Sequence, residues 1–172
     1  MTDSYNYGNI NLATDPGDNF LQSIPGAAFG STNTAVLISG TTPVVVGDAF
    51  TYVSSVTEGD SIIINKTGLY QINATISNGA AAPLTASISR GATGSLNLDP
   101  PGFGGAQGNI ALGADPTSSI GFTIQLSATI YVSQADLAQP TPTPINPARI
   151  IRVLATPGAA ITANSRLFIR AI

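Results

Sequence analysis

Residues 120–132 read Ile-Gly-Phe-Thr-Ile-Gln-Leu-Ser-Ala-Thr-Ile-Tyr-Val, and apolar side chains occupy every second position of this stretch. The positions between them are mostly polar or small. Because side chains alternate between the two faces of a β-strand, this pattern predicts a strand with one face in a core and the other toward water. Residues 70–76 alternate in the same way, and we expect both segments in the interior of a sandwich.

The same period of two continues from Ala27 to the end of the chain, with Gly, Pro and Asn about every ten residues. Short strands separated by such turn residues are typical of an all-β sandwich, and no segment shows the apolar face of a helix. The predicted strands are 27–30, 34–39, 43–46, 50–56, 61–65, 69–77, 84–90, 120–132, 149–155 and 166–172. Residues 96–108 and 139–147, rich in Gly and Pro, are predicted loops.

The chain of 172 residues divides into an N-terminal arm, 1–26, and one domain, 27–172. The arm is rich in Asn, Asp, Gly, Thr and Ser, but it also carries spaced apolar groups, which a plain spacer would lack. These predicted connector residues are Tyr5, Tyr7, Ile10, Leu12, Phe20, Leu21 and Ile24. We expect the arm to dock on another molecule after assembly, or else to lie on its own domain.

Three predicted strands carry apolar groups on both faces: 62–64, 150–151 and 167–169. A sandwich buries only the inner face of each sheet, so a second apolar face indicates a subunit interface or a covering loop. Arg152 and Arg170 share the outer face and could stack or pair across that interface. The predicted trimer-interface residues are Ile62, Ile64, Ile150, Arg152, Leu154, Phe168, Arg170 and Ile172.

The chain is unusually poor in charge, because only 9% of its residues are charged while 43% are hydrophobic. Soluble domains usually contain about 25% charged residues, which keep their surfaces apart. The formal net charge of −3 gives weak repulsion between copies. Two explanations are open: a surface of Thr, Ser and Asn, or a surface that is buried against other copies of the chain.

The residue types that are missing exclude most catalytic classes, because the chain has no His and no Cys. It therefore lacks the commonest general base, a thiolate nucleophile and a Cys/His zinc site. Asp48, Glu58 and Asp60 lie beside glycines, where carboxylates can hold calcium or merely shape a turn, and we expect the turn. We predict no enzymatic activity, no cofactor and no metal.

Other partners are also disfavoured by composition. The six cations form no basic run suited to a phosphate backbone, so nucleic acid is not an expected partner. No apolar stretch approaches the roughly 20 residues that span a membrane. The first residues lack the cationic start and apolar stretch of a secretory signal, so we expect another route out of the cell.

Residues 60–72 read Asp-Ser-Ile-Ile-Ile-Asn-Lys-Thr-Gly-Leu-Tyr-Gln-Ile: a strand, a tight turn at Thr67-Gly68, and a second strand that opens with the inward aromatic Tyr70. This run resembles the central hairpin of C1q/TNF-like jelly rolls, specifically those of bacterial exosporium proteins such as the C-terminal domain of BclA and the basal-layer protein BxpB. Residues 27–30, residues 44–48 and the apolar strand ending at Ile172 fit the same proteins.

The resemblance implies a ten-stranded antiparallel jelly roll that forms a homotrimer on the outside of bacterial endospores. It also implies release when the mother cell lyses, which would make a signal peptide unnecessary. The arm departs from the family, since it lacks a collagen-like Gly-X-Y stalk. We therefore expect it to link trimers axially in an appendage fibre or to anchor them to another exosporium protein.

The leading functional hypothesis is a structural, self-assembling subunit of an endospore fibre or exosporium layer. The alternative is a trimeric module for ligand binding or adhesion, which would use loops at the end of the trimer such as 96–108.

Overall fold

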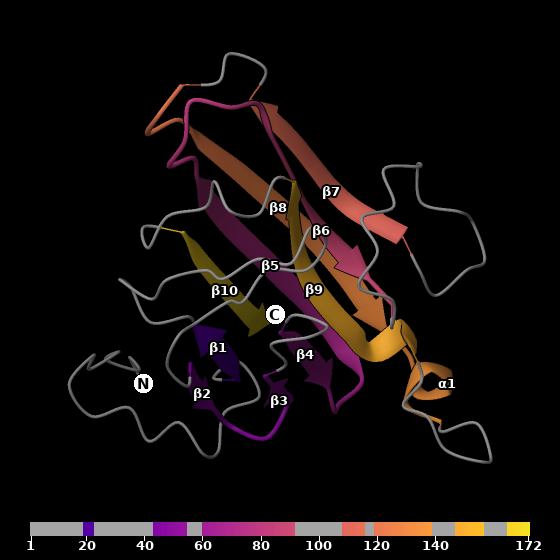
Figure 1. The fold of residues 1–172 in the computed structure, drawn as a ribbon. Coiled ribbons are helices and arrows are strands. Elements are labelled where there is room, and N and C mark those ends of the chain that lie inside the picture. Colours follow the sequence, from indigo (N-terminus) through magenta and orange to yellow (C-terminus); the bar gives the residue numbers. More distant parts are fainter. Residues whose placement is uncertain are drawn as a thin grey trace, which may run out of the picture.

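The computed structural model of the chain describes residues 19–22, 43–54, 60–91, 108–115, 119–138, 147–156 and 165–172. Its strands form two sheets of five strands each, stacked face to face (Figure 1). The expectation of an all-β sandwich with ten strands is confirmed. The predicted strands 27–30 and 34–39 lie outside the described residues, as do 96–107 and 139–146 of the predicted loops.

The first sheet has the strand order β2-β1-β10-β5-β8, and every neighbouring pair is antiparallel. Strand β1, near the start of the chain, pairs with β10 at its end. The strands of this sheet are β1 (Phe20–Gln22), β2 (Val44–Val46), β5 (Gly68–Ser77), β8 (Thr123–Val132) and β10 (Arg166–Ala171).

The second sheet has the order β3-β4-β9-β6-β7 and is also antiparallel throughout. Consecutive strands often lie in different sheets: the chain passes from β4 to β5 in the first sheet and then to β6 in the second. Such crossing between two stacked sheets is the topology of a jelly roll. The strands of this sheet are β3 (Phe50–Val53), β4 (Ser61–Ile64), β6 (Leu84–Arg90), β7 (Gly108–Asp115) and β9 (Ile150–Thr156).

The inward faces of the two sheets form one continuous core. Strand β5 contributes Tyr70, Ile72, Ala74 and Ile76, each no more than 2% exposed, as the alternation in the sequence predicts. Burying a side chain of this size stabilises the fold by about 1.5–3 kcal/mol, so the core dominates the stability of the domain.

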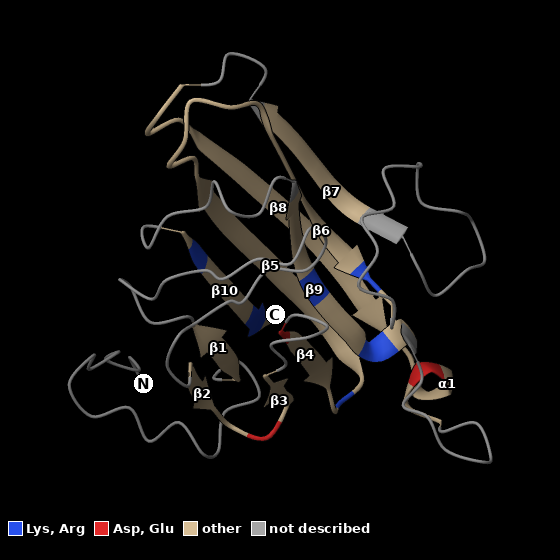
Figure 2. Cartoon of the chain, viewed as in Figure 1, with Lys and Arg blue, Asp and Glu red and all other residues tan. Residues whose placement is uncertain are grey.

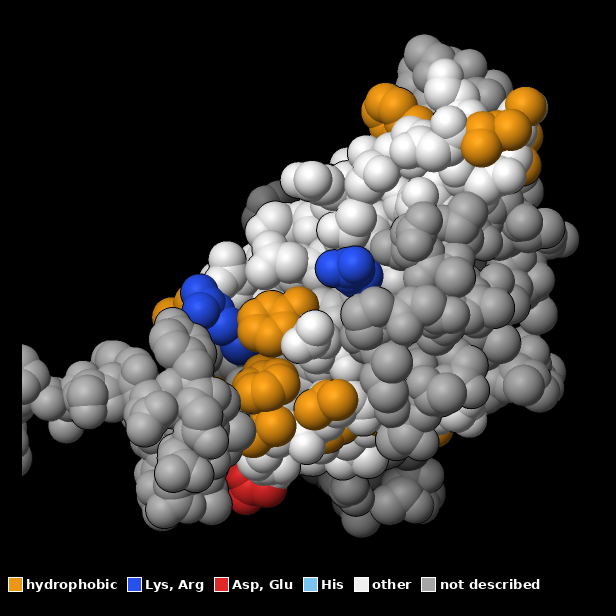
Figure 3. Space-filling view, turned by 90° about the vertical axis from the view of Figure 1, so that its left-hand side faces the viewer, with side chains coloured by type: hydrophobic (Ala, Val, Ile, Leu, Met, Phe, Trp, Pro, Cys, Tyr) orange, Lys and Arg blue, Asp and Glu red, His pale blue; other side chains and the backbone are white. Residues whose placement is uncertain are grey.

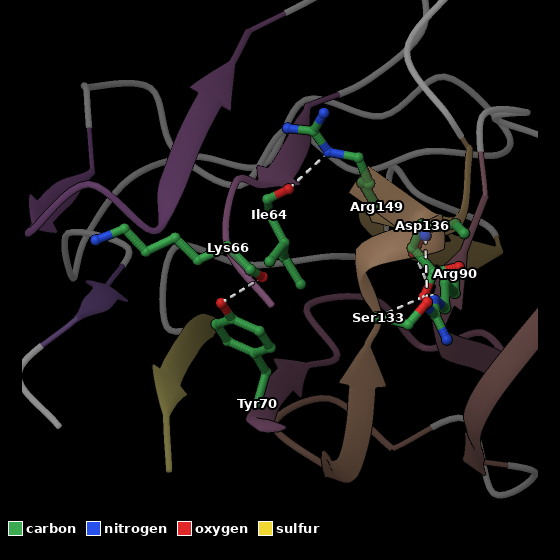
Figure 4. Close-up of polar contacts among 8 residues, drawn as sticks. Ile64, Lys66, Tyr70, Arg90, Ser133, Asp136 and Arg149 are labelled. Atoms are coloured by element: carbon green, nitrogen blue, oxygen red, sulfur yellow. Dashed lines mark hydrogen bonds and ion pairs between the residues drawn. The ribbon is translucent and has the colours of Figure 1, made fainter. Parts of the chain in front are cut away.

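The turn between β4 and β5 is present as predicted, but the predicted hairpin is wrong in its pairing, because β4 lies in the second sheet and β5 in the first. Gly68 follows the turn with a φ of 148°, a positive value that glycine tolerates. Tyr70 points inward, packs edge-on against Phe50 with ring centroids 5.5 Å apart, and donates its hydroxyl to the Lys66 carbonyl oxygen at 2.8 Å (Figure 4). The aromatic ring therefore fixes the turn to the core.

Two arginines tie the lower edge of the second sheet to the segment before β9. Arg149 donates from Nε to the Ile64 carbonyl oxygen at 2.7 Å. Arg90 donates to the Ala148 carbonyl oxygen and pairs with Asp136, 3.3 Å away (Figure 4). These contacts join β4 and β6 to the turn before β9 and to the short helix after β8.

Two strands and one helix differ from the prediction. Residues 20–22 form β1, although they were assigned to the arm. The strand was not predicted because three residues are too few to show a period of two. Residues 109–115, predicted as no element, lie in β7, whose Gly and Ala content weakens the pattern. A short helix, α1 (Gln134–Leu137), is capped by Ser133 and buries no residue, while η2 (Pro147–Arg149) is a single 3-10 turn.

Candidate self-association surface

The outward side of the β2-β1-β10-β5-β8 sheet is the face on which exposed apolar and basic side chains gather. Strand β10 alternates strictly: Leu167 and Ile169 point into the core, whereas Arg166, Phe168 and Arg170 point outward. We call this outward side the open face. The residues of β1 and β5 that lie opposite Arg166, Phe168 and Arg170 in the sheet share this face.

Two phenylalanines form the centre of the open face. The register places Phe20 opposite Arg170 and Gln22 opposite Phe168, so the two rings are diagonal neighbours. Their centroids lie 5.9 Å apart at 34°. Val44, 48% exposed, extends the apolar patch onto β2. Figure 3 shows this hydrophobic group between basic side chains.

The open face carries basic groups at both ends of β10, Arg166 and Arg170, and both are exposed (Figure 2). Arg170 donates from Nε to the Gln71 side-chain oxygen at 3.0 Å. The ion pairs found among the described residues are Lys66 with Asp48 and Arg90 with Asp136, and neither involves these two arginines. The face thus offers apolar area and hydrogen-bond donors together, a combination that suits a protein interface.

A second apolar group lies at the lower end of the same sheet, where Leu69, Tyr131 and Ile172 are 46%, 58% and 59% exposed. Leu69 and Tyr131 are cross-strand partners. The Ile172 amide donates to the Leu69 carbonyl oxygen at 3.0 Å, which holds the C-terminal residue beside them. Sequence reasoning missed Leu69 and Tyr131 as surface candidates, although Tyr131 is the one large aromatic on the polar side of β8.

The predicted interface residues fall in three places. Phe168, Arg170 and Ile172 come from β10 and the C-terminal residue, and their outward positions agree with a surface role. Ile62 and Ile64 do not: both are fully buried in the core between the sheets. The assignment of Ile62 and Ile64 to an interface was wrong, because both side chains point into the core. Ile63, between them, points outward.

The remaining three predicted interface residues lie on β9. Ile150, Arg152 and Leu154 point away from the core, on the outward side of the second sheet. They are 8%, 5% and 0% exposed, so they are buried within a single chain. They face away from the β10 residues, and the eight predicted residues therefore do not form one surface.

The connector residues divide at Asn19. Phe20 and Leu21 belong to β1, and Leu21 is fully buried in the core, so these two residues lie on their own domain, which was the second of the two expectations for the arm. The Asn19 side-chain oxygen accepts from the backbone amides of Asp48 and Ala49 at 3.0 and 3.1 Å, which fixes the start of β1 against the β2–β3 turn. Tyr5, Tyr7, Ile10, Leu12 and Ile24 lie outside the described residues.

Two of the three carboxylates beside glycines, Asp48 and Asp60, have partners within the chain, and Glu58 lies outside the described residues. Asp48 accepts a hydrogen bond from Lys66, which holds its pKa below the usual value. Asp60 is buried and accepts from the Tyr52 hydroxyl at 2.5 Å and from the Ser54 hydroxyl at 3.1 Å. Burial, together with this contact, raises the pKa of Tyr52 to about 12. These groups fix β3 and β4 to each other.

Over the part of the chain that the structure describes, no helix is long and apolar enough to cross a membrane. Within the same part, no group of three acidic side chains converges as a metal site would require.

No protein-family model matches the sequence, and no curated protein matches it. Solved structures do match. Murine APRIL at pH 8.5 is 12% identical with a TM-score of 0.55, over 90% of this chain and 98% of the APRIL chain. The vertex protein P5 of PRD1 is 19% identical with a TM-score of 0.52, over 90% of this chain and 95% of that one. At these identities the likeness establishes the fold alone, and the expected TNF-like jelly roll is confirmed.

Proposed function

We propose that this chain is a structural, non-enzymatic subunit that self-associates as a homotrimer through the open face. Trimers would then build an appendage fibre or the exosporium layer on the surface of bacterial endospores. The N-terminal segment would link one trimer to the next or anchor it to another exosporium protein.

The open face is the observation that carries the proposal. Phe20 and Phe168 form an apolar centre, exposed arginines flank it, and Leu69, Tyr131 and Ile172 extend it to the lower end. Exposed apolar groups gathered in this way mark interaction sites more often than isolated ones do. With only 9% charged residues, copies of the chain repel one another weakly.

The spore surface is supported by sequence. The run 60–72, on which the resemblance to exosporium proteins rests, has its turn before Gly68 and Tyr70 inward, although its two strands lie in different sheets. The similar fold of the PRD1 vertex protein P5 is compatible with a structural role, although a shared fold does not by itself assign one.

Lateral association is tested by light scattering on the purified full-length chain after size exclusion. We expect a mass of three chains, or of a whole multiple of three where trimers are linked axially, because axial contacts add complete trimers. A monomer at every concentration would contradict the homotrimer.

Location is tested separately, by immunogold labelling of intact spores of the organism that encodes the chain. Gold on appendages or on the exosporium supports the proposal. Gold confined to the mother cell or to the spore interior contradicts the spore-surface function, whatever the mass of the purified protein.

A further inference from the structure

One end of the sandwich presents two large apolar side chains on a rigid turn. Ile120 and Phe122, on either side of Gly121, are 71% and 42% exposed. They precede β8 at the upper end in Figure 1, next to the connection from β5 to β6. We call residues 78–83 and 119–122 together the distal end.

Hydrogen bonds hold the distal end in one conformation. The Asn78 backbone amide donates to the Phe122 carbonyl oxygen at 2.8 Å, and the Gly121 amide donates to the Asn78 carbonyl oxygen at 2.6 Å. The buried Asn78 side chain also donates to the Ala82 carbonyl oxygen at 2.9 Å and accepts from the Ala80 amide at 3.1 Å. A fixed surface loses little conformational entropy when a partner binds, which favours binding.

Gly121 itself has a φ of 84°, and a side chain added there would meet nothing within 4 Å. The positive φ turns the chain so that its two apolar neighbours lie at the tip. Open space above the turn leaves room for a partner.

The distal end and the N-terminal segment match in chemistry. Residues 78–83 and 119–122 contain no charged residue, and neither do residues 4–14. That segment supplies apolar groups at Tyr5, Tyr7, Ile10 and Leu12, separated by amides and small residues. Binding of this segment to the distal end removes no charged group from water, so the cost of desolvation is low. Binding to the open face would remove water from its arginines, which costs more.

The topology places the distal end away from the point where the N-terminal segment joins the domain. The Asn19 carbonyl oxygen accepts from the Ala171 amide, and Ala171 is opposite Tyr70 near the start of β5. Asn78 follows the last residue of the same strand, eight positions along, which is roughly 25 Å. The N-terminal segment therefore joins the domain at the end opposite the distal end. It can reach a distal end either by folding back along its own domain or by binding a second copy.

We infer that the distal end is the docking surface for the N-terminal segment of a second copy. This inference rests on the proposed function and specifies where its axial contact is made. Eighteen residues reach at most about 60 Å, which suffices to pass from Asn19 onto the distal end of an adjoining copy. The contact joins two different surfaces, so it does not close, and repetition builds a filament.

Two variants of the full-length chain separate the halves of this contact. The end variant carries Ile120→Ser and Phe122→Ser and keeps its N-terminal segment. The segment variant lacks residues 2–18, which precede β1 in the chain, and keeps its distal end. The matched control carries Val53→Ser and Leu112→Ser, which replace two side chains that are 39% and 54% exposed elsewhere on the surface.

Each variant alone is expected to keep the lateral mass of the wild type in light scattering and to form no filament in negative-stain electron microscopy. The control forms filaments as the wild type does. Mixing the end variant with the segment variant gives particles of twice the lateral mass and no longer assembly. The three segments of one trimer occupy the three distal ends of the other, and neither trimer then offers a contact to a third. A labelled peptide of residues 1–18 binds the segment variant, and Ile120→Ser with Phe122→Ser raises its Kd at least about tenfold.

Filaments formed by the end variant would overturn the inference while leaving the proposed lateral and spore-surface functions intact. Filaments formed by the segment variant would show that domains stack directly, which overturns both this inference and the proposed linking role. Peptide binding that is unchanged by the two serines would overturn the docking site alone. A wild-type chain that stays monomeric would contradict the proposed homotrimer, and this result is distinguishable from a failure of the axial contact.

Discussion

The outward apolar residues of β4 and β9 in the second sheet are buried, whereas those of the first sheet are not. On the second sheet, Ile63, Ile150 and Leu154 point away from the core and are still no more than 8% exposed. On the first sheet, Phe168 is partly exposed, and Leu69 and Ile172 are about half exposed. The comparison teaches that a second apolar face marks an interface only where the chain does not bury that face itself.

The largest expected effect comes from the buried side of this comparison. Leu154→Ala removes a fully buried side chain and should lower the free energy of unfolding by about 2–5 kcal/mol. Urea unfolding followed by circular dichroism measures it. Phe168→Ala, on the open face, should cost the single chain about 1 kcal/mol or less. Equal losses in the two variants would mean that both faces are equally buried.

The next effect concerns association through the open face. Phe168→Ser removes half of the central ring pair and should weaken the lateral oligomer by about 2 kcal/mol, roughly thirtyfold in its dissociation constant. Sedimentation velocity across a dilution series measures the constant. Leu112→Ser, at an exposed outward position on β7 in the second sheet, serves as control and should leave the mass unchanged. An unchanged constant for Phe168→Ser would remove the open face as the lateral interface.

A smaller effect is expected from the polar contact that fixes β3 to β4. Tyr52→Phe removes a hydrogen bond to the buried Asp60 carboxylate and should cost about 1.5 kcal/mol. The pKa of Tyr52 is raised to about 12, so the folded state holds this proton more tightly than the unfolded state. Stability should therefore fall as pH rises from about 10 to about 12, and Tyr52→Phe should lose that part of the pH dependence. Urea unfolding at several alkaline pH values measures both effects, and an identical slope in the two proteins would contradict the assignment.

The smallest effect lies at Asp136, next to the second sheet. Burial raises the pKa of Asp136, but hydrogen bonds from Ser133 and the charge of Arg90 outweigh it, and the pKa lies below the usual value. The ionised carboxylate thus stabilises the fold at pH values above the ordinary Asp pKa of about 4. This stabilisation is lost as the pH falls through the lower pKa that Asp136 has in the folded state. Asp136→Asn should cost about 1 kcal/mol or less at neutral pH and flatten the acid limb of the unfolding curve. Ser133→Ala should show part of the same change, whereas an unaltered acid limb would argue against the contact.

Much of the fold could be predicted because it depends on local pattern. The alternation in 70–76 and 124–132 predicted the inward residues of β5 and β8, and residues 84–90 were predicted with the bounds that β6 has. The same alternation was wrong for Ile120 and Phe122, which precede β8 and are exposed. Strand β1 could not be found, because its three residues are held by pairing with β2 and β10, distant in sequence. The candidate surface was predicted in part: Phe168, Arg170 and Ile172 lie outward, while Ile62 and Ile64 were assigned to the wrong face.

The sequence by itself determined the class of fold and most strand positions, because a period of two is a property of neighbouring residues. It also determined that histidine and cysteine chemistry is absent. Only the tertiary structure decided which outward face is buried and that Phe20 meets Phe168, since burial depends on segments brought together from far along the chain. The same holds for the distal end, where Asn78 fixes a turn more than forty residues away.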